Sequence, residues 1–227
     1  MPQRPAVPCF LMSFPMTDWI DISVPVRPGM VHWPGDPEFR IERRLDMDKG
    51  DPCTVSRISM GVHTGTHMDA PLHFLRSGAS IDSMPISATV GPARVIPITN
   101  TESVKPAELE QHLIQAGERI LLKTANSDHA WNTDDFIENF VYISREGANY
   151  LAECNVAAVG VDYLSVGGFT KDGPETHEAL LSAGVWVIEG LNLSGIEPGD
   201  YDLVCLPLLL IGAEGAPARA ILNRRPE

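Results

Sequence analysis

The sequence lacks any run of roughly eighteen or more consecutive apolar residues, the length from which a bilayer-spanning helix is recognised. Basic side chains are also scarce. Lysine and arginine number 17 against 30 aspartates and glutamates, which gives a formal net charge of -13. A surface of that sign repels phosphate backbones and anionic lipids. We therefore expect no membrane span, no nucleic-acid partner and no membrane-surface role.

Cysteine is rare as well. The four cysteines are Cys9, Cys53, Cys154 and Cys205, and they form neither a CxxC pair nor a short-spaced framework. Thiols spaced so far apart favour a reducing compartment, so we expect the protein in the cytoplasm. Repeats, linkers and low-complexity segments are absent too, and 227 residues suit a single domain. We assign residues 1–17, which are rich in proline, to a tail and residues 18–227 to the domain.

The order of the predicted elements indicates an α/β fold. Strands come first, helices and strands alternate from about residue 105 to 190, and strands return at the end. Val159 and Val187 lie in continuous apolar runs, as parallel central strands require. The sequence therefore predicts one domain with a mixed sheet. The predicted strands cover 19–26, 39–45, 53–62, 93–99, 119–124, 156–162, 185–190, 201–210 and 216–222, and the predicted helices cover 106–117, 144–155 and 174–184.

One stretch, HTGTHMDAPLHF at 63–74, carries three histidines and an aspartate within eleven positions. Imidazole nitrogen and carboxylate oxygen are ligands that divalent transition metals prefer. Gly65 stands between His63 and His67, where a tight turn needs a residue that tolerates positive φ. The zincin motif HExxH is excluded because Thr64 occupies the position of its glutamate. We interpret the stretch as a loop that turns His63, His67 and Asp69 toward one metal site.

Two later residues could complete this site. His177 lies in a predicted helix, and Glu189 ends the apolar strand VWVI, where a carboxylate is costly to bury unless it is paired or coordinated. Each has a simpler reading: His177 as a surface residue, and Glu189 as the partner of an arginine such as Arg219. Together with the first cluster they give five ligands, one more than a closed four-coordinate zinc site takes. Five ligands suit two divalent ions bridged by carboxylates.

Five segments together resemble the metal-dependent cyclase family, which includes bacterial kynurenine formamidases and isatin hydrolases. The resemblance extends from about residue 18 to 222. The segments are HTGTHMDAPLHF at 63–74, WPGD at 33–36, VGVDYLSV at 159–166, THEALLSAGVWVIEGL at 176–191 and the closing LPLLL followed by GAEGAPARAIL.

The resemblance implies a swivelling β/β/α domain that forms a homodimer or homotetramer. It implies that His63, His67 and Asp69 bind metal and that Asp69 is shared between two ions. His177 and Glu189 complete the pair. His73 acts as the proton donor and acceptor rather than as a principal ligand. Trp33 of the WPGD loop contacts the substrate; its simpler reading is a loop tryptophan that covers a core edge.

The chemistry of these residues agrees with that assignment. Two divalent ions carry four positive charges, of which Asp69 and Glu189 cancel two, so an excess remains that favours hydroxide over water. The neutral His73 imidazole could carry a proton from the water to the leaving nitrogen. Trp33 offers a flat apolar face to an aromatic ring. We expect two ions, zinc or alternatively manganese, because imidazole and carboxylate ligands accept both.

Three functions stay open from sequence. The first is a hydrolase that cleaves a small-molecule amide, either an aryl formamide similar to N-formylkynurenine or a cyclic amide. The second is a metal- or ligand-binding module without catalysis, which the retention of all six residues of the site argues against. The third is a structural zinc domain, which would unfold when its metal is removed.

Overall fold

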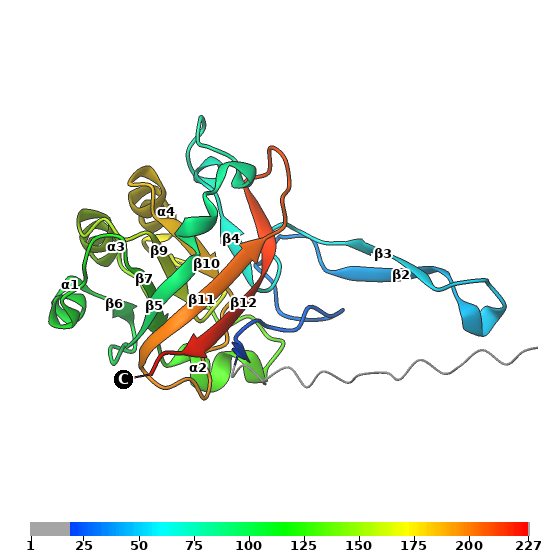
Figure 1. The fold of residues 1–227 in the computed structure, drawn as a ribbon, viewed down its shortest axis with the longest axis horizontal. Coiled ribbons are helices and arrows are strands. Elements are labelled where there is room, and N and C mark those ends of the chain that lie inside the picture. The colour runs from blue at the N-terminus through cyan, green and yellow to red at the C-terminus, as the bar shows by residue number, and fades with distance from the viewer. Residues whose placement is uncertain (1–18, 227) are drawn as a thin grey trace, which may run out of the picture.

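A closed sheet forms the body of the protein in the computed structural model, which describes residues 19–226. The tail predicted for residues 1–17 lies outside the described residues. The strand order is β1-β12-β11-β5-β7-β9-β10-β4, and β4 also pairs with β12, which closes the sheet (Figure 1). The strands of this sheet are β1 (Trp19–Asp21), β4 (His67–Asp69), β5 (Val90–Pro97), β7 (Arg119–Lys123), β9 (Ala158–Val161), β10 (Trp186–Glu189), β11 (Gly199–Pro207) and β12 (Gly215–Arg224).

Helices α1 (Pro106–Leu109), α3 (Arg145–Glu153) and α4 (Gly173–Ser182) cover one side of this closed sheet, and a two-stranded arm projects from the other (Figure 1). The arm consists of β2 (Arg40–Leu45) and β3 (Val55–Ser59), which pair only with each other among residues 19–226. A second small sheet joins β6 (Ser103–Val104) to β8 (Tyr142–Ile143). The α-helices are α1 (Pro106–Leu109), α2 (Asn126–His129), α3 (Arg145–Glu153) and α4 (Gly173–Ser182). The 3-10 turns are η1 (Met47–Lys49), η2 (Pro71–His73), η3 (Ile81–Ser83), η4 (Ile86–Ala88), η5 (Glu110–His112) and η6 (Ala130–Asn132).

Alternating side chains of the central strands divide the core into two layers. Leu121 and Ile188 belong to the cluster that also contains Met68 and Leu203, from strands around the ring. Ile120, Leu122 and Val187 belong to the cluster that contains residues of α3 and α4. Central strands buried on both faces read as continuous apolar runs, and the pairings β5–β7, β7–β9 and β9–β10 are parallel as predicted.

The predicted α/β fold with a mixed sheet is confirmed, and among the elements that differ from prediction three matter most for the core and the site. The strand predicted for 19–26 ends at Asp21. The helix predicted for 106–117 ends as α1 at Leu109 and continues only as η5, because Leu113 adopts a left-handed conformation with φ 49°. Leu113 is consequently exposed, and the turn lets Ile114 reach the helix-side core.

The third difference concerns the histidine-rich stretch itself. Residues 67–69 are not part of a loop, as we interpreted them, but form the fully buried strand β4. A strand so short carries no alternation that a sequence pattern could reveal. None of the helices within residues 19–226 is long and apolar enough to cross a membrane.

Candidate metal centre

Strand β4 brings ligand-type side chains together because it lies between β10 and β12. Glu189 is opposite His67 in the antiparallel register of β10 and β4. Residues directly opposite in such a pair share a face, and so do residues two apart on one strand. His67, Asp69 and Glu189 therefore lie on one face of the sheet, while Met68 between them points into the core.

Glycines allow the segments that carry these residues to approach closely. Gly65 has φ 67° and Gly190 has φ 70°, and a Cβ on Gly190 would meet the Gly65 carbonyl oxygen at 2.2 Å. The Thr66 hydroxyl donates to the Gly190 carbonyl at 2.6 Å and joins the two turns. Gly215 at the start of β12 leaves room for the His63 ring, which a Cβ there would meet at 2.8 Å. The positive φ expected at Gly65 is therefore present.

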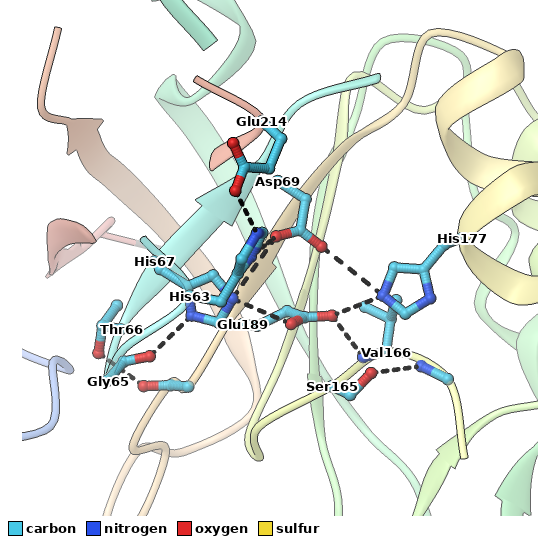
Figure 2. Close-up of polar contacts among 12 residues, drawn as sticks. His63, Gly65, Thr66, His67, Asp69, Ser165, Val166, His177, Glu189 and Glu214 are labelled. Atoms are coloured by element: carbon cyan, nitrogen blue, oxygen red, sulfur yellow. Dashed lines mark hydrogen bonds and ion pairs between the residues drawn. The ribbon is translucent and has the colours of Figure 1, made fainter. Parts of the chain in front are cut away.

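Two buried imidazoles face two buried carboxylates (Figure 2). His67 Nε2 lies 3.1 Å from Glu189 Oε2 and 3.5 Å from Asp69 Oδ1. His177 in α4 places its Nε2 3.2 Å from Glu189 Oε1 and 3.6 Å from Asp69 Oδ2. The Val166 backbone N–H donates to Glu189 Oε1 at 2.7 Å and holds that carboxylate in place. The simpler reading of Glu189 as a partner of Arg219 is wrong, because Arg219 pairs with Asp21.

Backbone carbonyls orient both imidazoles. His67 Nδ1 lies 2.9 Å from the Gly65 carbonyl and His177 Nδ1 lies 2.7 Å from the Gly173 carbonyl. A neutral imidazole carries one N–H, so donation from Nδ1 leaves an Nε2 lone pair aimed at the carboxylates. Lone pairs and carboxylate oxygens repel each other unless a proton or a cation lies between them. Such a second interaction behind the ring is typical of metal-ligating histidines.

The pKa values of the buried groups also indicate that positive charge is favoured between the carboxylates. Burial alone lowers the pKa of His67, but Glu189 and Asp69 overcome this effect and raise that pKa to about 9. Burial and the neighbouring Asp69 charge oppose ionisation of Glu189, yet His177 and His67 hold its pKa below the ordinary value. The buried carboxylates of Asp69 and Glu189 are thus stabilised by nearby positive charge.

Unpartnered polar atoms show that a cation fits. Among residues 19–226, the buried atoms His63 Nε2, His67 Nε2 and Asp69 Oδ2 have no hydrogen-bond partner, which is costly for a buried polar group. Ligand atoms of His67, Asp69 and Glu189 lie within 4.8 Å of one another, and so do those of His63, Asp69 and His73. Asp69 belongs to both groups.

His73 lies at the edge of this cluster. It ends η2, and its ring stacks on His63 with the ring centroids 4.0 Å apart. Its centroid is 5.8 Å from that of His177. Burial lowers the pKa of His73 below its ordinary value, which keeps the imidazole neutral near pH 7. The geometry thus allows His73 either to bind metal or to exchange protons with a molecule in the site.

A cavity of about 540 Å³ opens over the cluster and is lined by His63, His73, His177 and Glu189. Trp33 forms part of its wall and meets Phe169 and Phe136 edge to face, with ring centroids 5.4 Å away in both cases. The reading of Trp33 as a cover for a core edge holds in part, because Trp33 also packs against the cluster around Phe140. An aromatic wall beside polar groups is typical of a small-molecule site.

The structure brings together all seven residues selected from sequence: Trp33, His63, His67, Asp69, His73, His177 and Glu189. Sequence reasoning missed Phe169, which follows the glycine pair of the GGFT segment, and Glu214, whose carboxylate is 3.9 Å from His63 Nε2 (Figure 2). Glu214 could have been selected from sequence, because it is the charged residue of the glycine-rich GAEGAP turn and loops carry a large share of binding residues.

Comparison with known proteins places this chain among enzymes. The Cyclase family model matches residues 20–167. A kynurenine formamidase from Bacillus cereus is 34% identical over 207 residues, which cover 91% of this chain and 98% of the relative.

Solved structures of metal-dependent hydrolases and isatin hydrolases are also similar to this chain. A "predicted metal-dependent hydrolase" from Bacillus stearothermophilus is 34% identical, with a TM-score of 0.80 over 92% of this chain and 99% of that chain. Isatin hydrolase A from Ralstonia solanacearum is 26% identical, with a TM-score of 0.76 over 90% of each chain. A family model that spans more than half of the sequence, together with a relative matched over nearly its full length, shows that the chain belongs to the Cyclase family.

Proposed function

We propose that this protein is a metal-dependent hydrolase that cleaves the amide C–N bond of an aryl formamide similar to N-formylkynurenine, or of a cyclic amide. The observation that carries the proposal is the buried group of imidazoles and carboxylates, with unpartnered atoms, beneath an aromatic-walled cavity. The similarity to a kynurenine formamidase and to an isatin hydrolase supports this substrate class.

The metal would be held by His63, His67, Asp69, His177 and Glu189, with Asp69 between two ions. Their imidazole and carboxylate donors suit both zinc and manganese. Divalent ions bound there supply the positive charge that makes water a nucleophile near neutral pH and that polarises the amide carbonyl.

His73 is the proton carrier in this proposal. Because burial lowers its pKa, the neutral imidazole can accept a proton from the attacking water and return it to the leaving nitrogen. The water oxygen bonds to the carbonyl carbon and the C–N bond breaks. An aryl formamide then yields formate and the aryl amine, and a cyclic amide yields the ring-opened amino acid.

Trp33 and Phe169 would bind the aromatic part of the substrate. Their rings meet edge to face at the wall of the cavity, and the volume of about 540 Å³ is in the range of small-molecule sites. Aromatic faces favour aromatic ligands through offset or edge contacts.

A reducing cytoplasmic location also belongs to the proposal. Cys53, Cys154 and Cys205 are all free, and Cys53 is exposed. Exposed free thiols are typical of compartments where disulfides do not persist.

The experiment is turnover of N-formylkynurenine, isatin and simple lactams by the metal-free protein reconstituted with zinc or with manganese. We expect hydrolysis of the formamide or of isatin that depends on added metal and that stops with chelator. If metal binds with a defined stoichiometry and no amide is cleaved, the protein is a binding module instead.

A further inference from the structure

His63 differs from the other two histidines of the candidate metal centre in what lies behind its ring. His67 and His177 each have one ring nitrogen against a backbone carbonyl and the other nitrogen toward the buried carboxylates. His63 instead has its Nδ1 atom 2.8 Å from Asp69 Oδ1, and within residues 19–226 no backbone carbonyl accepts from its ring. Its other nitrogen, Nε2, is buried and has no hydrogen-bond partner among the same residues. The second nitrogen of His63 therefore needs a partner.

Glu214 is the charged group that faces this nitrogen. Its Oε1 atom lies 3.9 Å from His63 Nε2 (Figure 2). Among residues 19–226, His63 is the one ion-pair contact of Glu214, whose side chain is 46% exposed. A separation of 3.9 Å is longer than a hydrogen bond. A half-exposed glutamate side chain can close that gap by rotation about its own bonds.

The backbone holds Glu214 beside His63. The Ala70 N–H donates to the Glu214 carbonyl at 2.9 Å, and Gly215 is paired with Asp69 in the register of β12 and β4. A Cβ on Gly215 would meet the His63 ring at 2.8 Å. The glycine thus makes room for the ring, and the glutamate before it supplies a carboxylate at the edge of that ring.

Two tautomers of His63 have to be compared, because a neutral imidazole carries one N–H. With the proton on Nδ1, the Nε2 lone pair would face Glu214, and no group of three or more ligand-type side chains within residues 19–226 includes Glu214. With the proton on Nε2, the Nδ1 lone pair faces Asp69, in the group that His73 also belongs to. The second tautomer places a cation where more ligand-type side chains lie.

We propose that Glu214 is a positioning residue of the metal centre, which accepts the Nε2–H of His63 so that Nδ1 binds the ion at Asp69. The proposal rests on the proposed function only in that His63 binds metal. A carboxylate behind a metal-binding imidazole fixes the orientation and the tautomer of the ring and makes its other nitrogen a stronger donor.

The zinc affinity of the metal-free protein, measured by competition with a chelator of known affinity, tests this role. E214A should weaken the binding of at least one zinc ion about 10- to 100-fold, the usual effect of losing such a partner. E214Q should keep most of the affinity, because the amide oxygen still accepts a hydrogen bond. E197A is the matched control, since Glu197 is exposed and lies outside the cavity and the ligand groups. All three variants should keep the circular dichroism of the wild type.

Two results of this titration would contradict the proposal. Equal zinc affinities of E214A and the wild type, or no zinc binding by the wild type, would overturn it. An equal loss in E214A and E214Q would make Glu214 a metal ligand rather than a hydrogen-bond acceptor, because an amide oxygen is a weaker ligand than a carboxylate. Zinc binding as expected without cleavage of any amide would refute the proposed function and leave the role of Glu214 in place.

Nuclear magnetic resonance reads the tautomers directly. In the zinc-loaded protein with ¹⁵N-labelled histidine, long-range ¹H–¹⁵N spectra show which nitrogen of each ring carries the proton. We expect two metal-bound histidines with the proton on Nδ1, as the carbonyls behind His67 and His177 require, and one with the proton on Nε2. The signals of that third ring should shift in E214A and stay unchanged in E197A. Metal-bound histidines that all carry the proton on Nδ1 would overturn the proposal.

Discussion

At the scale of single residues, the histidines proposed to bind metal differ in their hydrogen bonds from the histidine proposed to transfer protons. His67 and His177 have their Nδ1 atoms committed to backbone carbonyls, so that only Nε2 faces the carboxylates. His73 has no hydrogen bond of this kind within the described part of the chain, and its contacts are ring contacts with His63 and Phe74. A ring held by stacking remains free to accept and release a proton.

Replacement of His73 by alanine should separate catalysis from metal binding. We expect the H73A protein to keep its metal content and circular dichroism but to lose about 10²- to 10⁴-fold in kcat, the usual contribution of a positioned acid–base group. The measurement is steady-state turnover alongside metal analysis. H112A is the control, because His112 lies in η5 outside the cavity. Loss of metal in H73A would make His73 a ligand instead.

Trp33 should control affinity rather than rate. W33A should raise KM for an aromatic amide about 3- to 10-fold, the range expected for the loss of one aromatic contact, with metal content unchanged. W33F should recover most of the affinity. Trp131 belongs to the same aromatic cluster but does not line the cavity, so W131F is the control. An unchanged KM in W33A would remove Trp33 from the substrate site.

The density of the 63–73 motif made His63, His67, Asp69 and His73 predictable, because few other arrangements explain so many ligand-type side chains in so short a segment. Glu189 was predictable from the cost of burying a carboxylate. Phe169 was not, because its role depends on the ring of Trp33, which is far away in sequence and meets it only in the folded protein. Contacts of this kind leave no local pattern.

At the scale of elements, the end of β9 is hydrogen-bonded to the start of α2, which the sequence did not reveal. Asp162 follows β9 directly and is completely buried. Its carboxylate accepts from the Thr124 backbone and hydroxyl at 2.7 and 2.8 Å and from the Ser127 hydroxyl at 2.6 Å. It thereby ties the end of β7 to the segment that leads through Tyr163 into the cavity wall.

Substitution of Asp162 by asparagine should destabilise the fold without changing the metal content. The amide replaces one acceptor oxygen by a donor that faces other donors, and each buried polar group left unpaired costs about 1–3 kcal/mol. We expect D162N to lower the midpoint of thermal unfolding by several degrees. D202N is the control, since Asp202 is partly exposed and pairs loosely with Arg225. Equal unfolding midpoints for the two variants would contradict this role for Asp162.

Elements with a strong period were predictable, and elements fixed by their neighbours were not. The helix predicted for 144–155 is present as α3, and its Ser144 N-cap accepts from Gly147 N–H as expected. Strand β4 exists because β10 and β12 pair with it on both sides, so its three residues needed no strand propensity of their own. Tertiary pairing overrides local preference in such short segments.

At the scale of the whole molecule, the α/β order predicted a mixed sheet but not its closure. Closure depends on the single contact between β12, at the end of the chain, and β4, and no local pattern connects them. The same contact supports the candidate metal centre, because β4 carries His67 and Asp69. The two core layers on either side of the sheet contain none of the proposed ligands. The protein should therefore remain folded without metal, unlike a structural zinc domain.

Metal removal and pH together test this independence. In the metal-free protein the pKa of His67 is raised from 6.5 to about 9. Protonated His67 therefore stabilises the folded state fully below pH 6.5, and this contribution is lost as the pH rises to about 9. We expect the chelated protein to keep its far-ultraviolet circular dichroism and to unfold cooperatively on heating. The midpoint temperature of unfolding should decrease as the pH is raised from 6.5 to about 9. Added zinc displaces these protons, so the stabilisation by metal should grow over the same interval. Collapse of the dichroism on chelation at pH 7 would mean that the ions hold the fold together, and the independence inferred from the two core layers would be wrong.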